Sequence, residues 1–522
     1  MRLIGKFNIG MSKSLNTFIT DLKYNFQETL ILIFFVLLLF RFIEYLWQNR
    51  NLFKRAWNIQ GPLNLPIIGS SYLFFRNPAG YMKRMEKLHC QYPKIFKIWL
   101  GPNNVLFALS DPEYIKKLFT DPKATEKAFI YDVLTEVFGP GILTAPAKIW
   151  KPHRRAISPY FTKNRIDSFV KTFSEDSAKF VNQLREVGNN KDYDWSLFVK
   201  RYSLDVVCKS VMGMDLKINY VKHREDDLGH SIDMLNHYGI IKSLQVWYHV
   251  GMIYTFSTVK KKFEKYRELF NNITTSAVRE KLHQLKDNDN ADYAETETKK
   301  RRPDLIEMIY SNPIFTEQSL IYEVNTFLAA ATDTTGMAIC TTFLMLAMHP
   351  GIQQKVYDEV IDAIGLTEEI DPTGLVKMKY TERVIKETLR LFPPVVMFGR
   401  RLTGDINLGD IILPKGASAG LIPSLLHRDP KYWKDPLTFN PDRFLPEENS
   451  KRHPCTYIPF SYGARNCIGK YYAFQNLKTL TATVIREFMI YTAYKSVEEV
   501  EFTLQGVLTL THGVKLWFEP RT

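Results

Sequence analysis

The stretch Phe460-Ser-Tyr-Gly-Ala-Arg-Asn-Cys-Ile-Gly469 places one cysteine, one arginine and two glycines within ten residues. Apolar residues then recur at three- and four-residue steps, which predicts a helix directly after the stretch. Cys467 is therefore expected in a loop before a helix N-terminus, where free backbone N–H groups favour a thiolate over a thiol. Arg465 adds a permanent cation, and Gly463 and Gly469 let the backbone approach a flat group. A thiolate in such a loop suits an axial ligand of haem iron.

Every fixed position of this stretch matches a known pattern. It resembles the haem-binding loop of the cytochrome P450 family, Phe-x-x-Gly-x-Arg-x-Cys-x-Gly. The resemblance implies that Cys467 is the axial iron ligand. It also implies that the haem is contacted by Phe460, Gly463, Arg465 and Gly469.

Cys467 has two other possible roles. A free cysteine on its own is more commonly a buried structural residue. A zinc site shared with His453 and Cys455 lacks a fourth ligand at a usual spacing. The complete motif favours the haem ligand over both.

Residues 317–348 read as one long apolar helix that ends at His349-Pro350. The run 330–335, Ala-Ala-Thr-Asp-Thr-Thr, lies at its centre, where an acid is costly unless it is used. The Thr334 hydroxyl can bond back to the Ala330 carbonyl and open the helix locally. Alone, this would indicate only a back-bonded or N-capping threonine. The run resembles the family's oxygen-activation motif, which implies that Thr334 holds oxygen bound at iron and Asp333 relays protons.

Two positions depart from the family pattern. Ala331 stands where the motif has glycine, so a tighter groove is expected. The run 323–327 resembles the family-4 clan of animal microsomal enzymes, insect members included. Many of those carry a glutamate at the position of Ala330, and that glutamate can esterify the haem. We therefore expect haem b held without a covalent bond at Ala330. Fatty-acid terminal hydroxylation, the best-known role in that clan, does not follow.

Two further segments are expected to meet the haem propionates. Trp150 and Arg154 are spaced i,i+4 and share one helix face. They resemble the family's Trp-x-x-x-Arg pair, and Arg400 matches a second propionate partner after the pocket-lining segment 395–400. A guanidinium suits a carboxylate because its planar fork binds two oxygens. Without the resemblance, Arg154 would be read as a surface arginine.

A structural network is expected around Glu387. Glu387 and Arg390 at i,i+3 would by spacing alone form a solvated pair worth about 0.3 kcal/mol. They resemble the family's Glu-x-x-Arg, which locks to an arginine in a Pro-x-Arg-Phe segment. Arg443 occupies that position here. The network shapes the haem loop and is not catalytic.

Roles or conformations can be predicted for three other segments. The aromatic-rich region 237–258 resembles the part of the family that covers the substrate entrance and dips toward lipid, although core filling is an equal alternative for any one residue. Residues 507–512 resemble the last turn into the pocket, where Val507 and Leu508 would contact substrate. Residues 286–302 are charged and polar and read as a loop.

The N-terminal region divides into an extension, an anchor and a hinge. Residues 1–29 are polar and mildly basic, and 30–47 read as a transmembrane anchor in which Arg41 and Glu44 can pair. Arg50, Lys54 and Arg55 follow, so the body, residues 70–522, is expected in the cytosol at the endoplasmic reticulum. The proline-rich hinge is 48–69. A monotopic or buried helix, or a mitochondrial transit peptide in 1–29, remain alternatives.

Composition limits the partners. The 522 residues include 69 basic and 55 acidic side chains, a net charge of +14. No nucleic-acid motif is visible, so membrane lipid or an acidic protein is the expected partner of a basic surface. Five scattered cysteines indicate a reducing compartment rather than a disulfide framework.

The sequence thus predicts a mainly α fold with a smaller β region, the cytochrome P450 fold. The protein is predicted to be a membrane-anchored haem-thiolate monooxygenase that acts on a lipophilic small molecule. Its electrons must come from another protein, because the chain has no Gly-x-Gly-x-x-Gly. NADPH–cytochrome P450 reductase is the expected donor, with cytochrome b5 as a second candidate. A reductase-independent isomerase or dehydratase and a non-catalytic haem or lipophile carrier are the alternatives, which NADPH consumption would separate.

Overall fold

The computed structural model describes residues 28–521 except 38, 66–67, 76–79, 102–103, 188–192, 222–226 and 291–302. Three predictions therefore fall largely or partly outside the described residues: the extension 1–29, of which only 28 and 29 are described, part of the hinge, and most of the charged loop. By their contacts the residues divide into two units, Met1–Asn58 and Ile59–Thr522.

The first unit contains an apolar helix, Glu28–Gln48, and a short helix α2, Arg50–Trp57. The apolar helix has 21 residues and is long enough to cross a membrane, so it is a candidate anchor. Arg41 and Glu44 form the expected i,i+3 ion pair at 3.0 Å. The helix begins and ends slightly outside the predicted range 30–47.

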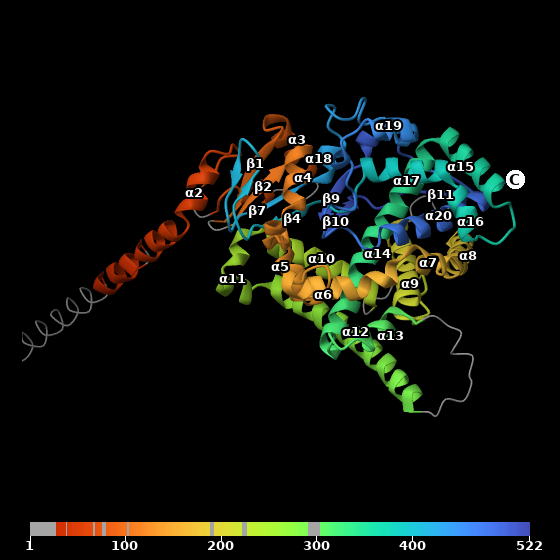
Figure 1. The fold of residues 1–522 in the computed structure, drawn as a ribbon, viewed down its shortest axis with the longest axis horizontal. Coiled ribbons are helices and arrows are strands. Elements are labelled where there is room, and N and C mark those ends of the chain that lie inside the picture. The colour runs from red at the N-terminus through yellow and green to blue at the C-terminus, as the bar shows by residue number, and fades with distance from the viewer. Residues whose placement is uncertain are drawn as a thin grey trace, which may run out of the picture. The chain divides into compact units, whose positions relative to one another are not determined.

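The second unit is mainly helical, as predicted (Figure 1). Its helices are α3 Tyr81–Gln91, α4 Pro112–Thr120, α5 Asp132–Phe138, α6 Ala147–Ile157, α7 Lys163–Asp167, α8 Val170–Val187, α9 Trp195–Val207, α10 Leu228–Leu244, α11 Gly251–Thr255, α12 Thr258–Asn290, α13 Leu305–Tyr310, α14 Glu317–Met348, α15 Pro350–Ala363, α16 Pro372–Lys377, α17 Lys379–Leu391, α18 Pro423–His427, α19 Pro446–Ser450 and α20 Lys470–Glu487.

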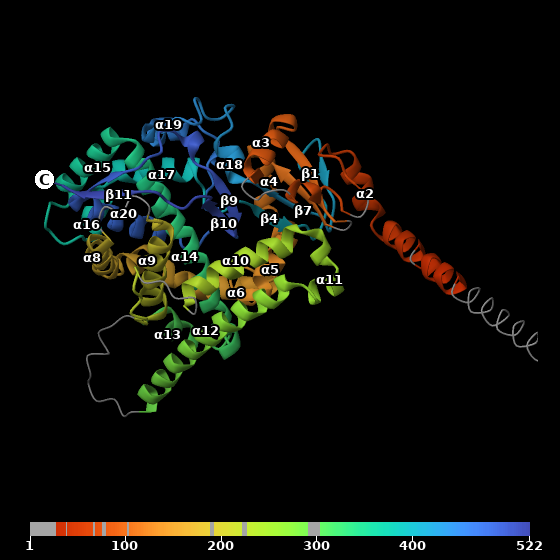
Figure 2. The same cartoon turned by 180° about the vertical axis from the view of Figure 1, so that it is seen from behind.

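The β region is smaller. Its strands are β1 Ile95–Leu100, β2 Asn104–Leu109, β3 Glu126–Lys127, β4 Phe398–Arg401, β5 Ile406–Asn407, β6 Ile412–Leu413, β7 Ser418–Leu421, β8 Phe488–Tyr491, β9 Phe502–Gln505, β10 Val507–Leu510 and β11 Trp517–Pro520. One sheet has the order β1-β2-β7-β4-β3, in which only β2 and β7 are parallel. The other sheets are the pairs β9–β10, β8–β11 and β5–β6. Seen from both sides, the five-stranded sheet lies beside α3 and α4, away from α15 and α16 (Figures 1 and 2).

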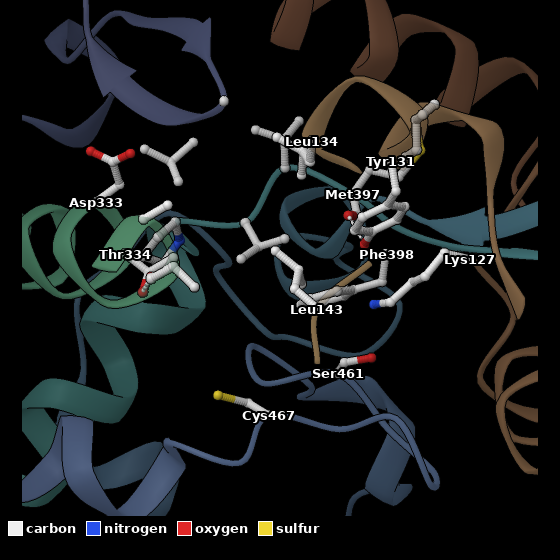
Figure 3. A pocket seen from close by; sticks show the side chains of 18 of the residues that line it. Lys127, Tyr131, Leu134, Leu143, Asp333, Thr334, Met397, Phe398, Ser461 and Cys467 are labelled. Atoms are coloured by element: carbon white, nitrogen blue, oxygen red, sulfur yellow. Dashed lines mark hydrogen bonds between the residues drawn. The ribbon is translucent and has the colours of Figure 1, made fainter. Parts of the chain in front are cut away.

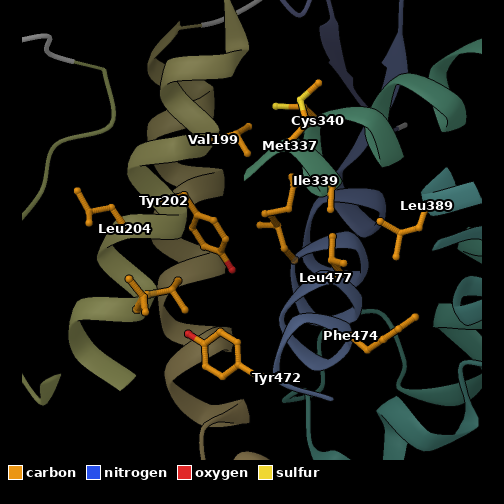
Figure 4. Packing of buried hydrophobic residues seen from close by; sticks show 14 of the residues in the cluster. Val199, Tyr202, Leu204, Met337, Ile339, Cys340, Leu389, Tyr472, Phe474 and Leu477 are labelled. Carbon is orange, nitrogen blue, oxygen red and sulfur yellow. The ribbon is translucent and has the colours of Figure 1, made fainter. Parts of the chain in front are cut away.

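Helix α14 forms the centre of the core. It begins after a capping box at Thr316 and ends at His349, before Pro350, which are the predicted limits. Its apolar composition also passes the length test for a membrane span, yet 83% of that window is buried, so it is a core helix. Side chains of α14 pack between α9 and α20 (Figure 4).

Two segments refine the predictions. Helix α12 extends to Asn290, so residues 286–290 are helical and the prediction of a loop there is wrong. The aromatic-rich region 237–258 spans the end of α10, a helical turn at Val246–His249, and α11. Its exposed apolar side chains include Trp247, Met252 and Phe256.

Candidate functional site

The loop Phe460–Gly469 lies directly before α20, and its backbone folds back on itself. The Cys467 N–H donates to the Phe460 carbonyl at 2.9 Å. Gly463 has φ +75°, and a Cβ there would lie 2.0 Å from the Phe119 carbonyl oxygen, so this position requires glycine. A Cβ at Gly469 would meet only the Cys467 sulfur, at an ordinary 3.9 Å. Protein atoms therefore require glycine at 463 but leave room at 469.

The environment of the Cys467 sulfur differs from the prediction. Burial raises the pKa of this thiol, and the Gly469 N–H together with Arg154, Lys470 and Lys127 lowers it only in part. The expectation that the loop alone favours a thiolate is therefore wrong, because loss of hydration dominates. The residue keeps accessible surface, and it lines a cavity (Figure 3).

Helix α14 presents Thr334 to the same cavity. The Thr334 hydroxyl donates to the Ala330 carbonyl at 2.7 Å, the predicted back-bond. Thr334, Ala330 and Ala331 all line the cavity. Figure 3 shows Thr334 on α14 and Cys467 on the loop before α20 facing one open space. The two segments are more than 130 residues apart in sequence, and the fold brings them together.

Asp333 also lines the cavity, and two other helices hold its carboxyl group. Asn236 on α10 donates to Oδ2 at 2.5 Å. Lys200 on α9 places its Nζ 3.3 Å from Oδ1. Burial raises the pKa of Asp333, and Lys200 partly opposes the rise. Sequence reasoning found Asp333 but missed Lys200 and Asn236, which no local pattern connects to it.

Helix α6 carries Trp150 and Arg154 next to the loop. Arg154 donates to the Asn466 carbonyl at 3.1 Å and to the Asn466 side chain at 3.2 Å. The Arg465 guanidinium lies 4.3 Å from the centre of the Trp150 ring. Trp150, Arg154 and Arg465 all line the cavity. The residues predicted to bind propionates on these two segments are therefore adjacent.

Two residues of the five-stranded sheet, Arg400 and Lys127, lie close enough to Arg465 to act on its charge or to feel it. Lys127 on β3 is the cross-strand partner of Arg400 on β4, so two cations stand directly opposite each other. Burial lowers the pKa of Lys127 well below its usual range, and Arg400 and Arg465 lower it further. Sequence reasoning missed Lys127 because β3 has only two residues. We call Lys127, Arg154, Arg400 and Arg465 the cationic cluster.

Two buried guanidinium nitrogens of the cationic cluster have no hydrogen-bond acceptor among the described residues. Among the described residues, neither Arg400 Nη2 nor Arg465 Nη1 has a hydrogen-bond partner, although both are buried. The remaining Arg465 nitrogens donate to the carbonyls of Thr125 and Ala145. Burial, followed by Arg400, lowers the pKa of Arg465 to about 10. Buried cationic donors without acceptors are costly, so this cluster fits the carboxylates of an anionic ligand.

The cavity measures about 790 Å³ and has mostly apolar walls. The segment Val395–Phe398 lines it together with Val507, whereas Gly399 and Arg400, the end of the predicted range 395–400, do not. Leu508 does not line it but packs in the core, and the lining residues nearby are Leu504 and Gly506. The prediction that Leu508 contacts substrate is therefore wrong. A cavity of this size and polarity suits a lipophilic ligand.

The predicted network around Glu387 is present and closed. Arg390 donates through two nitrogens to Glu387, at 2.7 and 2.9 Å, and through the third to the His427 carbonyl at 2.9 Å. Arg443 adds a contact to Glu387 at 3.3 Å. The His427 ring accepts the Ile458 N–H at 3.0 Å, which ties the network to the start of the loop. This supports a structural role.

The chain was compared with known proteins. A family model described as Cytochrome P450 matches residues 59–518. The chain is 29% identical over 468 residues to Cytochrome P450 4V2 of Mus musculus, covering 87% of each protein. It is also 29% identical over 502 residues to Cytochrome P450 4c3 of Drosophila melanogaster, covering 92% of each. A solved structure, "Crystal structure of cytochrome P450DA heme domain", has the same fold, with TM-score 0.73, 19% identity, and coverage of 89% of this chain and 98% of that one.

Proposed function

The chain belongs to the cytochrome P450 family and is a haem-thiolate monooxygenase similar to family-4 enzymes. From this premise we propose its substrate class, its electron donor and the roles of its site residues. It inserts one oxygen atom from O2 into a lipophilic small molecule, with electrons from an NADPH-dependent reductase. The observation that carries this proposal is an apolar cavity lined by Cys467, Thr334 and three members of the cationic cluster, Lys127, Arg154 and Arg465.

The cofactor is haem b held without an ester bond. The residues fit it in three ways: a thiol lining the cavity, a loop that only glycine can make at 463, and orphaned guanidinium nitrogens on Arg400 and Arg465. Ala330 carries no carboxylate that could form an ester. When bound, haem supplies the oxygen activation and the oxidation itself. Cys467 would be the residue that ligates its iron, because metal ligation deprotonates a thiol that burial otherwise keeps neutral.

The other side chains bind, orient and move protons. Trp150 and the cationic cluster hold the propionates, with Arg154, Arg400 and Arg465 as carboxylate partners. Phe460, Gly463 and Gly469 would border the cofactor in the loop that carries Cys467. Thr334 offers its hydroxyl oxygen in the cavity while its hydrogen is held by Ala330. Asp333 carries protons to that point, and the apolar walls exclude water and orient the substrate.

The apolar helix of the first unit supports a membrane anchor, and the net charge of the chain supports the choice of partner proteins. The helix Glu28–Gln48 anchors the protein in the endoplasmic reticulum membrane. Arg50, Lys54 and Arg55 follow it and keep the catalytic unit on the cytosolic side. NADPH–cytochrome P450 reductase docks on basic surface, which the net charge of +14 favours, and cytochrome b5 is a second donor. Cell fractionation tests this location, and recovery of the protein with mitochondria rather than microsomes would contradict it.

The first test is the absorption spectrum of the reduced, carbon-monoxide-bound protein, beside a Cys467→Ser variant. The wild type should show a strongly red-shifted Soret band, because a thiolate donates electron density to iron. The variant should lose it, since a hydroxyl is a far weaker donor. Wild-type protein that binds no haem, or an unchanged band in the variant, would contradict the proposal.

A further inference from the structure

The run 323–327, by which α14 resembles the family-4 enzymes, lies against one wall of the cavity. Its neighbour is the loop between α5 and α6, residues 139–146, which we call the wall loop. Ile142 and Leu143 of the wall loop line the cavity. Figure 3 shows Leu143 facing the same open space as Thr334 and Cys467. The position of the wall loop therefore limits the width of the cavity at this point.

Glu323 joins the wall loop to two helices. Its side chain is completely buried, although charged side chains are rarely buried without partners. Oε2 accepts the Ile142 N–H at 2.8 Å, and Oε1 lies 2.7 Å from Nδ1 of His153 on α6. The buried His153 ring packs on Phe315, just before α14, with 4.5 Å between the ring centres. One carboxylate of α14 thus holds both the backbone of the wall loop and helix α6.

The wall loop is tightly folded and lies close to α14. A Cβ at Gly141 would stand 2.2 Å from Thr326 Oγ1 and 2.5 Å from the Tyr322 carbonyl oxygen, so only glycine fits there. Within the loop, the Thr144 hydroxyl donates to the Gly139 carbonyl at 2.8 Å. The close contact with α14 and this internal hydrogen bond both stabilise one conformation of the loop.

Two charged side chains hold the wall loop on either side of Leu143. Glu323 binds the Ile142 N–H, and Arg465 of the cationic cluster donates to the Ala145 carbonyl at 2.6 Å. Hydrogen bonds with one charged partner are about twice as strong as neutral ones. Leu143 therefore lies between two strong anchors, of which only Arg465 lines the cavity. Loss of Glu323 would release one anchor and leave the arginine of the cofactor site in place.

We propose that Glu323, with His153, is a positioning residue that determines which shapes of substrate the cavity admits. The inference rests on the proposed function, because it concerns the substrate of the monooxygenase. By fixing the Ile142 N–H, Glu323 keeps Leu143 at the cavity wall, so that a slender group is admitted and a broad, branched one is excluded. Glu323 acts through the wall loop, since it does not itself line the cavity.

The first experiment tests the anchor by hydrogen exchange of the full-length protein, read by fragment-resolved mass spectrometry over residues 139–146. Glu323→Ala should exchange the Ile142 amide about tenfold faster or more, because a hydrogen bond to a charged group is lost. Glu323→Gln should keep slow exchange, since its amide oxygen can accept from Ile142 and its amide nitrogen can donate to His153. Unchanged exchange in Glu323→Ala would overturn the inference.

Glu359→Ala is the matched control. Glu359 also accepts two backbone N–H groups, those of Tyr380 at 2.5 Å and Thr381 at 2.7 Å, but none of these three residues lines the cavity. This variant should lose stability without changing exchange in the wall loop or the preference for ligand shape. An effect that Glu359→Ala shares with Glu323→Ala would reflect general loosening of the fold and would contradict the proposal.

The second experiment measures the shape preference of the haem-loaded protein with two isomeric probes, N-butylimidazole and N-tert-butylimidazole. An imidazole nitrogen can ligate haem iron, so binding is followed as a shift of the Soret band. The isomers have the same atoms, so the ratio of their dissociation constants reports shape more than hydrophobicity. Wild type should bind the butyl isomer more tightly. Leu143→Ala and Glu323→Ala should each move the ratio toward the tert-butyl isomer by about threefold or more, because one methylene in an apolar pocket changes affinity by about tenfold or more.

A double mutant tests whether Glu323 acts through Leu143. In the Leu143→Ala protein, Glu323→Ala should change the ratio little further, because the effects of coupled residues do not add. Additive effects, or a ratio that Glu323→Ala leaves unchanged, would overturn the inference. Glu323→Asp is the milder variant if Glu323→Ala does not fold. Its side chain is one methylene shorter and should lose one of the two contacts, so the ratio should move in the same direction.

The probes also separate the inference from the proposed function. Wild-type protein that gives no Soret shift with either probe would refute the proposed function itself, while hydrogen exchange would still decide whether Glu323 anchors the wall loop. Normal Soret shifts with the wild-type ratio in Glu323→Ala would refute only the present inference, because Glu323 would then stabilise the fold without selecting substrates.

Discussion

Buried arginines occur in two kinds of surroundings in this protein. Arg390 is completely buried and donates from all three nitrogens to protein oxygens. Arg400 and Arg465 are also buried, yet each leaves one nitrogen without a partner among the described residues. Since a buried unpaired donor costs free energy, the first arrangement is complete in the protein alone and the second is not. A buried arginine that lacks an acceptor therefore indicates where the carboxylate of a ligand binds. A buried arginine whose nitrogens all donate to protein oxygens indicates a structural role.

Removing the acid of the finished network should have the largest effect. Glu387→Ala leaves Arg390 and Arg443 without their carboxylate, and loss of one partner from a buried ion pair costs about 3–5 kcal/mol. Urea unfolding of the haem-free protein measures this loss. The control is Arg383→Ala, whose partner Asp442 is 55% exposed, with an expected cost below about 1 kcal/mol. Equal losses in both variants would contradict the comparison.

Replacing Arg400, which lacks an acceptor for one nitrogen among the described residues, should affect ligand binding more than stability. Arg400→Leu removes a cation that stands opposite Lys127, so the haem-free protein should lose little stability. Haem affinity should fall by about tenfold or more, because a charged hydrogen bond is worth about 1.5–3 kcal/mol. Haem transfer to apomyoglobin measures the affinity. A large loss of stability with unchanged haem retention would assign Arg400 to the scaffold.

The smallest effect concerns pH and the finished network. Burial, followed by Arg390, lowers the pKa of His427 to about 3. The unfolded chain binds the proton near pH 6.5, so stability is complete above pH 6.5 and falls as pH drops toward 3. Between pH 6.5 and 5.5 the loss should be about 1 kcal/mol. His427→Gln keeps an acceptor for Ile458 and should remove this part of the pH dependence, which urea unfolding at the two pH values would detect.

Local patterns predicted the parts of the site that are continuous in sequence. The limits of α14, the back-bond from Thr334 to Ala330 and the loop before α20 each follow from residues a few positions apart. The family resemblance added the partnership of Glu387 with Arg443, which spacing could not supply.

The sequence could not predict contacts made by short or distant elements. Lys127 lies on a strand of two residues, and Lys200 reaches Asp333 from a helix more than 100 residues earlier. The thiol of Cys467 was misjudged for a related reason. Its pKa depends on how much water the complete fold removes, whereas the sequence shows only the helix that follows.

The cationic cluster has a consequence for how much folded protein exists. Its like charges gather in a low-dielectric pocket, and Lys127 and Arg465 hold their charge less firmly there than in water. A ligand that brings two carboxylates relieves this repulsion only in the native state, so its binding is thermodynamically linked to folding. The melting temperature should therefore climb with free haem concentration. In a living cell, porphyrin supply would then set the abundance of this protein as well as its occupancy.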